Sequence, residues 1–334
     1  MSQAGIAAID CYLPQRILAN AEIAKQFPEW DPKRAERITG VRERRVEPAE
    51  TPASDMALQA ARNLLDNYNI PKETIDFVIV ITQSGDYVLP ATACILQHKL
   101  GLSTSTGAMD VNLGCSAYVY GLATAKGLVE SGAARNVLLV TVEKTSFAMH
   151  PEDITLKVLQ GDAATATLVS KENVFADICA MDFGTDGSGY DNIIVPCGGS
   201  AEIYETKQPQ FAEFPHPHHV NMKGMNIFNF SVSAVPKTLT RCLEKNGLSL
   251  DEIDHFVFHQ ANKIILDTIG SVLKIPREKI QTNIETVGNT SSCSIPLLLC
   301  DMKNQGALKP QDRVMLCGFG VGLSWSSAVL KVVS

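Results

Sequence analysis

The residues best suited to chemistry in this chain are a cysteine, a histidine and an asparagine, each placed where an apolar run ends. Cys115 lies in AMDVNLGCSAYVYGL, His259 directly follows HFVF, and Asn289 lies in TVGNTSS, just before another apolar run. A cysteine thiolate is a strong nucleophile and a good leaving group. Histidine and asparagine side chains can donate hydrogen bonds to an oxyanion. Together these residue types predict covalent chemistry at the cysteine.

Cys115 stands at the joint between a predicted strand and a predicted helix. Val119, Leu122 and Leu128 keep helical spacing, which predicts a helix from Ser116 onward. The beginning of a helix presents unpaired N–H groups and a partial positive charge, and both favour a thiolate over a thiol. We therefore expect a lowered pKa for Cys115, and its own N–H group can point toward a site for an oxyanion.

Each of these residues also has a purely structural interpretation. A single histidine after a strand is more often a hydrogen-bonded structural residue, and most buried cysteines are small hydrophobic residues. All three, however, follow strands or begin helices, and open α/β sheets place their chemistry at such positions. This shared placement favours the functional interpretation of the three residues over the structural one. The histidines of FPHPHH, by contrast, predict a surface loop and no metal site, because acidic and thiol partners are missing nearby; they are His216, His218 and His219.

An internal repeat organises the elements that must position these residues. The segment NIPKETIDFVIVITQS (69–84) matches NGLSLDEIDHFVFHQA (246–261), and ARNVLLVTVE (134–143) matches PQDRVMLCGFG (310–320). Both pairs agree on one offset of about 178 residues, which is too long for a solenoid and indicates a duplicated domain.

Within each half, predicted strands alternate with predicted helices, which is typical of an α/β fold with a buried sheet. We expect an N-terminal half, residues 1–170, that carries the nucleophilic cysteine. A C-terminal half, residues 171–334, carries the histidine and the asparagine. The two halves are expected to pack sheet against sheet around shared helices. The segment 171–225 is rich in Gly, Pro and Asp and is expected to be the connection between them.

Composition excludes several classes of protein. The chain has 334 residues and a formal net charge of −7, which argues against nucleic-acid binding because such proteins carry a basic surface. No apolar run reaches the roughly 18 residues of a membrane span. The nine cysteines include no CxxC pair, and no secretory leader is recognisable at the start. We therefore expect a cytoplasmic protein.

Six sequence blocks together resemble the β-ketoacyl-acyl-carrier-protein synthase III family of the thiolase superfamily. They are GCSAYVYGL, HQAN, GNTSSCSIP, GFGVGLSW, ITGVRERR (38–45) and QGDAATATLV (160–169). The resemblance covers the whole chain and implies a thiolase-like five-layered αβαβα fold made of two duplicated halves, and a homodimer. It also implies a catalytic triad of Cys115, His259 and Asn289, with backbone N–H groups of Cys115 and Val321 as an oxyanion hole.

The reaction implied by this resemblance has two halves. Cys115 takes an acyl group from an acyl thioester, and a malonyl-type thioester then loses carbon dioxide and condenses with it to a β-ketoacyl product. The substrates are coenzyme A or acyl-carrier-protein thioesters, and no cofactor is implied. Two alternatives remain open at this point. One is an acyltransferase that passes the acyl group to an oxygen or nitrogen nucleophile, and the other is a non-catalytic scaffold.

The resemblance also suggests which residues contact the substrates. The candidates for carrier or coenzyme A binding are Trp30, Gly224, Phe228 and Lys263. Ile38 and Ile154 stand where coenzyme A-dependent relatives carry arginine, and Lys274, Arg277 and Lys279 are available as further basic groups. GDYVLPATAC (85–94) is similar to the family segment that reaches the partner's acyl pocket across the dimer. Leu89 stands there in place of a phenylalanine common in short-chain-specific members, so we expect a primer longer than acetyl.

Overall fold

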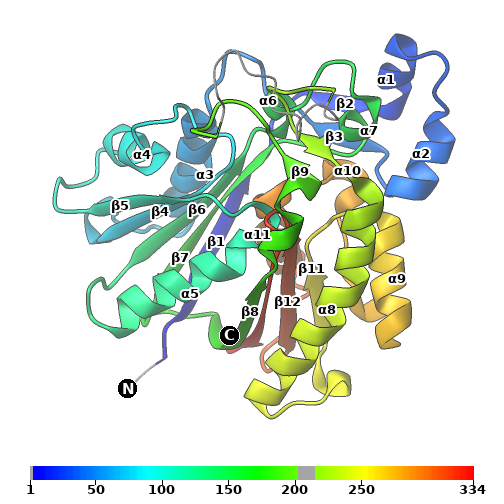
Figure 1. The fold of residues 1–334 in the computed structure, drawn as a ribbon. Helices are drawn as coiled ribbons and strands as arrows, with labels where there is room; N and C mark the ends of the chain where they lie inside the picture. Colours follow the sequence, from blue (N-terminus) through cyan, green and yellow to red (C-terminus); the bar gives the residue numbers. More distant parts are fainter. Residues whose placement is uncertain (1–2, 202–214) are drawn as a thin grey trace.

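The computed structural model describes residues 3–201 and 215–334, and a nine-stranded sheet runs through the molecule (Figure 1). The strand order is β11-β12-β13-β8-β1-β7-β6-β4-β5. Five strands precede residue 171: β1 (Gly5–Tyr12), β4 (Phe77–Ile81), β5 (Gly107–Val111), β6 (Val137–Glu143) and β7 (Ala163–Ser170). Four follow it: β8 (Ala176–Thr185), β11 (His255–Phe258), β12 (Arg313–Gly320) and β13 (Ser324–Val332).

The same strand arrangement occurs twice. In the first half β4 lies parallel to β6, with Phe77 opposite Val137. In the second half β11 lies parallel to β12, with His255 opposite Val314. The two halves of the sheet are joined where β1 pairs with β8 at residues 5 and 6. The duplication predicted from the repeated segments is therefore confirmed.

Helices form three layers around the two parts of the sheet. Figure 1 shows α5 (Ala117–Glu130) and α11 (Ser294–Asn304) between them. The outer face of the first part is covered by α3 (Ala53–Asn67) and α4 (Thr92–Leu100), and that of the second by α8 (Gly224–Asn246) and α9 (Lys263–Leu273). These layers give the order αβαβα, and the predicted five-layered thiolase-like fold is confirmed.

Strand β4 shows why the buried strands read as continuous apolar runs. Ile79 and Ile81 pack into the central core with α5 and α11, whereas Val78 and Val80 pack against α3 and α4. Successive side chains of a strand point to opposite faces, so a strand covered on both sides needs apolar residues at every position.

Short elements are concentrated at one end of the molecule, at the top of Figure 1. They are β2 (Ile17–Ala19), α1 (Asn20–Gln26), α2 (Pro32–Thr39), β3 (Glu43–Arg45), α6 (Thr145–Ala148), α7 (Ile154–Lys157), β9 (Ile193–Ile194), β10 (Asn221–Met222) and α10 (Ile284–Val287). Residues from α6, α7, β9 and β10 line the cavity described below. No helix among the described residues is long and apolar enough to cross a membrane.

The expectation that 171–225 forms only a connection is wrong for its first part. Strand β8 occupies residues 176–185 and lies in the middle of the sheet, between β1 and β13. Ala176 and Ile178 of this strand belong to the central core. The Gly, Pro and Asp residues that follow dominate the composition of the segment and conceal this strand. Residues 202–214 lie outside the described part of the chain.

Candidate active site

The three predicted catalytic residues meet in one cavity of about 370 Å³. Cys115, His259 and Asn289 all line it, and so do the predicted oxyanion residue Val321 and the predicted binding residue Gly224. Its apolar wall includes Leu156, Leu159, Ile193, Val195, Ile227 and Ile265. An apolar wall around a few convergent polar groups is typical of a binding site for a partly apolar small molecule.

Two glycines make room for the nucleophile. Cys115 lies in a short 3₁₀ turn, Gly114–Ser116, immediately before α5. Gly114 has a φ of +68°, and a Cβ atom there would lie 2.5 Å from the side-chain oxygen of Gln83. A Cβ atom on Gly320 would lie 3.1 Å from Sγ of Cys115. Glycine at 320 therefore lets this segment approach the sulfur closely, and glycine at 114 leaves room for the Gln83 side chain beside the nucleophile.

Burial dominates the electrostatics of Cys115. The pKa of the thiol is raised to about 11; burial is the largest cause, and the carboxylate of Glu143 acts in the same direction. The Ser291 hydroxyl, whose oxygen lies 3.5 Å from Sγ, and the backbone N–H groups of Val321 and Cys115 act in the opposite direction. The direction is thus opposite to the lowered pKa expected from the helix N-terminus. The backbone N–H groups of the two predicted oxyanion residues, Cys115 and Val321, nevertheless both lower the pKa of the thiol.

His259 is a neutral imidazole in this cavity. It is 2% exposed, and burial lowers its pKa to about 3, an effect that the Ser291 carbonyl opposes only weakly. The Ser294 hydroxyl oxygen lies 2.8 Å from Nδ1 of His259 and 2.8 Å from the Ser291 carbonyl oxygen. The ring of Phe319 packs edge-on at 5.5 Å between centroids. These contacts fix the ring through Nδ1.

The amide of Asn289 is oriented by its neighbours. Its Oδ1 accepts a hydrogen bond from the Ser291 N–H at 2.9 Å, and its Nδ2 donates to the Ala261 carbonyl at 3.2 Å. The backbone is held too, because Asn289 donates to the Leu159 carbonyl and accepts from the Gly161 N–H. An amide nitrogen carries two donors. The second N–H of Nδ2 is therefore available to a ligand.

Glu143 and Ser291 also line the cavity, although the sequence analysis did not select them. Glu143 is 2% exposed and accepts hydrogen bonds from the Ser292 hydroxyl at 2.7 Å and the Gln83 N–H at 3.2 Å. Burial raises its pKa to about 7. One signal was available in the sequence: a single acidic residue ends the apolar run VLLVTVE, at the carboxyl end of β6.

The remaining binding candidates do not line the cavity. Trp30 packs on a small cluster that includes Ile23 of α1, and Phe228 packs against the core beneath α8 and α9. Lys263 begins α9, and its ammonium pairs with Asp267 one turn away.

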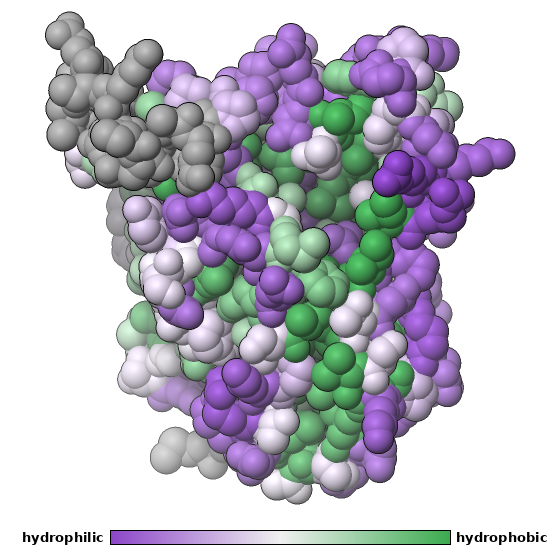
Figure 2. Space-filling view, turned by 45° about the vertical axis from the view of Figure 1, so that its right-hand side comes forward, coloured by the Kyte–Doolittle hydropathy of each residue, from purple (hydrophilic) through white to green (hydrophobic). Residues whose placement is uncertain are grey.

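The surface shown in Figure 2 carries a band of hydrophobic residues between hydrophilic margins, running from the upper right to the lower centre.

Leu89, predicted to belong to an acyl pocket, is 79% exposed in the single chain. It does not line the cavity of its own chain. Its neighbours Tyr87 and Val88 are 67% and 94% exposed. Three consecutive exposed apolar side chains are typical of a surface that another molecule covers. The role of Leu89 in a partner's pocket stays a prediction.

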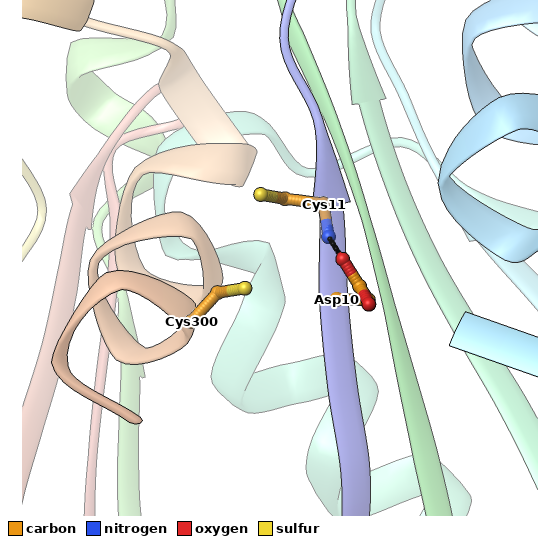
Figure 3. Close-up of side chains that lie close together, drawn as sticks. All are labelled: Asp10, Cys11 and Cys300. Atoms are coloured by element: carbon orange, nitrogen blue, oxygen red, sulfur yellow. Dashed lines mark hydrogen bonds between the residues drawn. The ribbon is translucent and has the colours of Figure 1, made fainter. Parts of the chain in front are cut away.

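Two clusters outside this cavity resemble metal sites only in composition. Cys11 of β1 and Cys300 of α11 point toward one another, and their sulfur atoms and a carboxylate oxygen of Asp10 lie within 4.8 Å of one another (Figure 3). The two carboxylate oxygens of Asp10 already accept hydrogen bonds, from the Cys11 N–H and the Asn67 amide. We therefore assign no metal ion to this cluster.

The second cluster consists of histidines. His216 and His219 lie in a loop, as predicted, and their rings pack on that of His150, at 3.8 and 5.0 Å between centroids. The ring planes of His150 and His216 are only 8° apart, so these two rings stack face to face. Stacked rings turn their faces to one another, whereas metal ligation requires converging ring nitrogens.

A thiolase-like fold with a Cys-His-Asn set in one cavity defines a condensing enzyme of the thiolase type. The family model for 3-oxoacyl-[acyl-carrier-protein] synthase III matches residues 109–187. The model for the C-terminal part of the same family matches residues 243–332. A β-ketoacyl-[acyl-carrier-protein] synthase III of Clostridioides difficile is 36% identical over 330 residues, covering 99% of this chain and 98% of the relative.

Solved structures agree with this assignment. A crystal structure of a 3-oxoacyl-(acyl-carrier-protein) synthase III matches with a TM-score of 0.93 and 42% identity, over 98% of this chain and 99% of the other. The priming β-ketosynthase of the R1128 polyketide pathway matches with a TM-score of 0.87 and 28% identity, over 100% of this chain and 97% of the other. The chain belongs to the β-ketoacyl-[acyl-carrier-protein] synthase III family.

Proposed function

We propose that this protein primes acyl-chain synthesis by condensing an acyl group held on Cys115 with a malonyl-type thioester. One observation carries this proposal: a single cavity brings Cys115, His259 and Asn289 together. The backbone N–H groups of Cys115 and Val321 also lower the pKa of the Cys115 thiol there.

In the first half-reaction, Sγ of Cys115 attacks the carbonyl carbon of an acyl thioester. The carbon–sulfur bond to the carrier breaks, the acyl group remains on Cys115, and the Cys115 proton leaves with the carrier thiol. The backbone N–H groups of Cys115 and Val321 are the proposed donors to the oxyanion that forms on the carbonyl oxygen. The apolar wall of the cavity suits the hydrocarbon part of the acyl group.

In the second half-reaction, the malonyl-type thioester loses carbon dioxide, and negative charge develops on the carbonyl oxygen of the thioester. We assign the stabilisation of this enolate to Asn289, through its available Nδ2–H, and to His259. For His259 to donate from Nε2, the Ser294 hydroxyl must turn its one proton from the Ser291 carbonyl, to which it donates in this structure, to Nδ1. The enolate carbon then attacks the acyl group and releases Cys115.

The carriers are proposed to be acyl-carrier-protein or coenzyme A thioesters, and the working unit a cytoplasmic homodimer. The names of the relatives support a carrier protein for at least one substrate. The alternative, transfer of the acyl group to an oxygen or nitrogen nucleophile, would use the same acyl-enzyme. It would not require the decarboxylation that we assign to Asn289 and His259.

Intact-mass measurement tests this proposal. The wild type, incubated with a panel of acyl-coenzyme A and acyl-carrier thioesters, should gain the mass of one acyl group, and Cys115→Ala should gain nothing. Cys94→Ser, which changes an exposed cysteine, should acylate like the wild type. The acylated protein should then release carbon dioxide from a malonyl thioester and form a β-ketoacyl product. Acylation of Cys115→Ala, or product formation with no carbon dioxide release, would refute the proposal.

A further inference from the structure

The cavity offers no positive charge to a Cys115 thiolate. No lysine or arginine is among its lining residues in the described part of the chain. The titratable groups that line it with Cys115 are His259, which burial keeps neutral, and Glu143, whose negative charge opposes a thiolate. A histidinium–thiolate pair, the usual means of activating a cysteine, is therefore not formed here. The negative charge on sulfur must be stabilised by hydrogen-bond donors.

Ser291 is the side chain placed to supply such a donor. Its hydroxyl oxygen lies 3.5 Å from Sγ of Cys115, although the two residues are 176 positions apart in the sequence. A hydroxyl group can donate to a sulfur acceptor and accept a second hydrogen bond at the same time. Its hydrogen bond lowers the pKa of this thiol, against the effect of burial.

The backbone of Ser291 is held in an uncommon conformation at this point. Its φ is +49°, in the left-handed region that non-glycine residues seldom adopt. Its N–H donates to Oδ1 of Asn289, and its carbonyl accepts from the Ser294 hydroxyl, which also contacts His259. Strained backbone of this kind persists where surrounding bonds enforce it, and it is concentrated at functional sites. One residue therefore contacts the nucleophile and orients Asn289.

We propose that Ser291 is a further catalytic residue, whose hydroxyl donates a hydrogen bond to the Cys115 sulfur and stabilises the attacking thiolate. Ser291 keeps its own proton throughout. The proton that Cys115 gives up on forming the thiolate is balanced by the proton that the departing carrier thiolate takes up, as the acyl–carrier bond breaks and the acyl–Cys115 bond forms. The identity of the acyl donor rests on the proposed function, but the effect on the thiol does not, and it can be measured without any thioester.

The test measures the rate at which iodoacetamide alkylates Cys115 as a function of pH, in Ser291→Ala and in Ser291→Gly. Peptide mapping separates Cys115 from the other cysteines, and exposed Cys94 serves as an internal reference. Hydrogen bonds to charged groups shift a pKa by about one to two units, so alkylation below that pKa should slow by about 10- to 100-fold. Both variants keep the N–H group that orients Asn289.

Thr290→Val is the matched control. Thr290 is the preceding residue, is fully buried, and its hydroxyl makes no hydrogen bond with any described residue. Valine has the same shape, so this variant should alkylate at the wild-type rate. Glycine, unlike alanine, relaxes the left-handed backbone. A wild-type rate in Ser291→Gly would show that backbone strain alone mattered and would overturn the proposal, as would an unchanged pH profile in both variants.

Acyl transfer is measured separately with an acyl thioester that the wild type accepts. If no thioester acylates the wild type, the proposed function fails while the alkylation result still stands. If the wild type acylates and the Ser291 variants slow in acylation by the same factor as in alkylation, the hydroxyl acts on the nucleophile. Slowed alkylation with an unchanged acylation rate would contradict a role of Ser291 in catalysis.

Discussion

At the scale of single residues, burial outweighs the helix N-terminus at Cys115. Burial raises the pKa from 9.0 to about 11, and two pKa units correspond to about 2.7 kcal/mol. A helix N-terminus stabilises an exposed negative group by only about 0.3–1 kcal/mol. The thiol is therefore mostly protonated at neutral pH, and local hydrogen-bond donors decide how readily it reacts.

His259 and Asn289 are expected to separate the two half-reactions. His259→Ala and Asn289→Ala should both still acylate Cys115, because thiolate stabilisation comes from Ser291 and the two backbone N–H groups. Each should lower decarboxylation and condensation by about 10²-fold or more, the usual cost of losing an oxyanion donor. Single-turnover acylation and carbon dioxide release from the pre-acylated protein measure the two steps independently.

Full condensation activity in either variant would contradict this role. Loss of acylation in His259→Ala would mean instead that His259 takes the proton from Cys115. Asn289→Asp is a useful companion, because it keeps the size of the side chain but replaces the donor Nδ2 with an acceptor. It should lose condensation as fully as Asn289→Ala does.

At the scale of elements, the loop that carries Asn289 is fastened to the first half of the chain. The Asn289 N–H donates to Leu159, and Gly161 donates back to the Asn289 carbonyl. A Cβ atom on Gly161 would lie 2.1 Å from the backbone oxygen of Val287. Backbone cannot move aside as a flexible side chain can. Glycine at 161 is therefore required for the two segments to meet and for Asn289 to enter the cavity.

Gly161→Ala is expected to disturb both stability and condensation. Overpacking of this kind costs about 1–3 kcal/mol, measured by chemical denaturation. Displacement of Asn289 should lower condensation more than acylation of Cys115. Gly127→Ala in α5 is the matched control, because a Cβ atom there meets nothing within 4 Å and alanine favours a helix. Equal effects in the two variants would show that the contact with Val287 is unimportant.

At the scale of the whole molecule, we expect the exposed segment Tyr87–Leu89 to connect dimer formation with primer selection. If Leu89 forms the floor of the partner's acyl pocket, its smaller size leaves room for chains longer than acetyl. Each additional buried methylene contributes about 0.8 kcal/mol, or roughly fourfold in affinity. A chain-length series of acyl thioesters should therefore show a preferred primer longer than acetyl.

Leu89→Phe should move this preference toward shorter chains and leave the elution volume in size-exclusion chromatography unchanged. Val88→Phe is a suitable comparison, since it enlarges the neighbouring side chain of the same segment, which is 94% exposed. Acetyl as the best primer of the wild type would refute the longer-chain prediction. An unchanged chain-length profile in Leu89→Phe would show that this residue does not border the pocket.

The sequence by itself determined the fold class and pointed to the three polar residues that meet in one cavity, Cys115, His259 and Asn289. Apolar runs such as FVIVI, repeated at a constant offset, predict buried strands because both faces of such a strand must be covered. The motif around Cys115 predicts a nucleophile because glycine, cysteine and the start of a helix are local features of the chain. Strand β8 was not predicted from the sequence, because the Gly, Pro and Asp residues after it dominate the composition of its segment.

Only the tertiary structure decided the environment of the nucleophile. Ser291, Glu143 and the amide of Val321 come from distant parts of the chain and meet Cys115 because α5, β6 and the loop before α11 pack together. Charge states depend on this packing, since the desolvation of a thiol or an imidazole is set by all surrounding atoms and not by its sequence neighbours. For this reason the sequence could place Cys115 at the start of a helix, but could not predict that burial would raise its pKa.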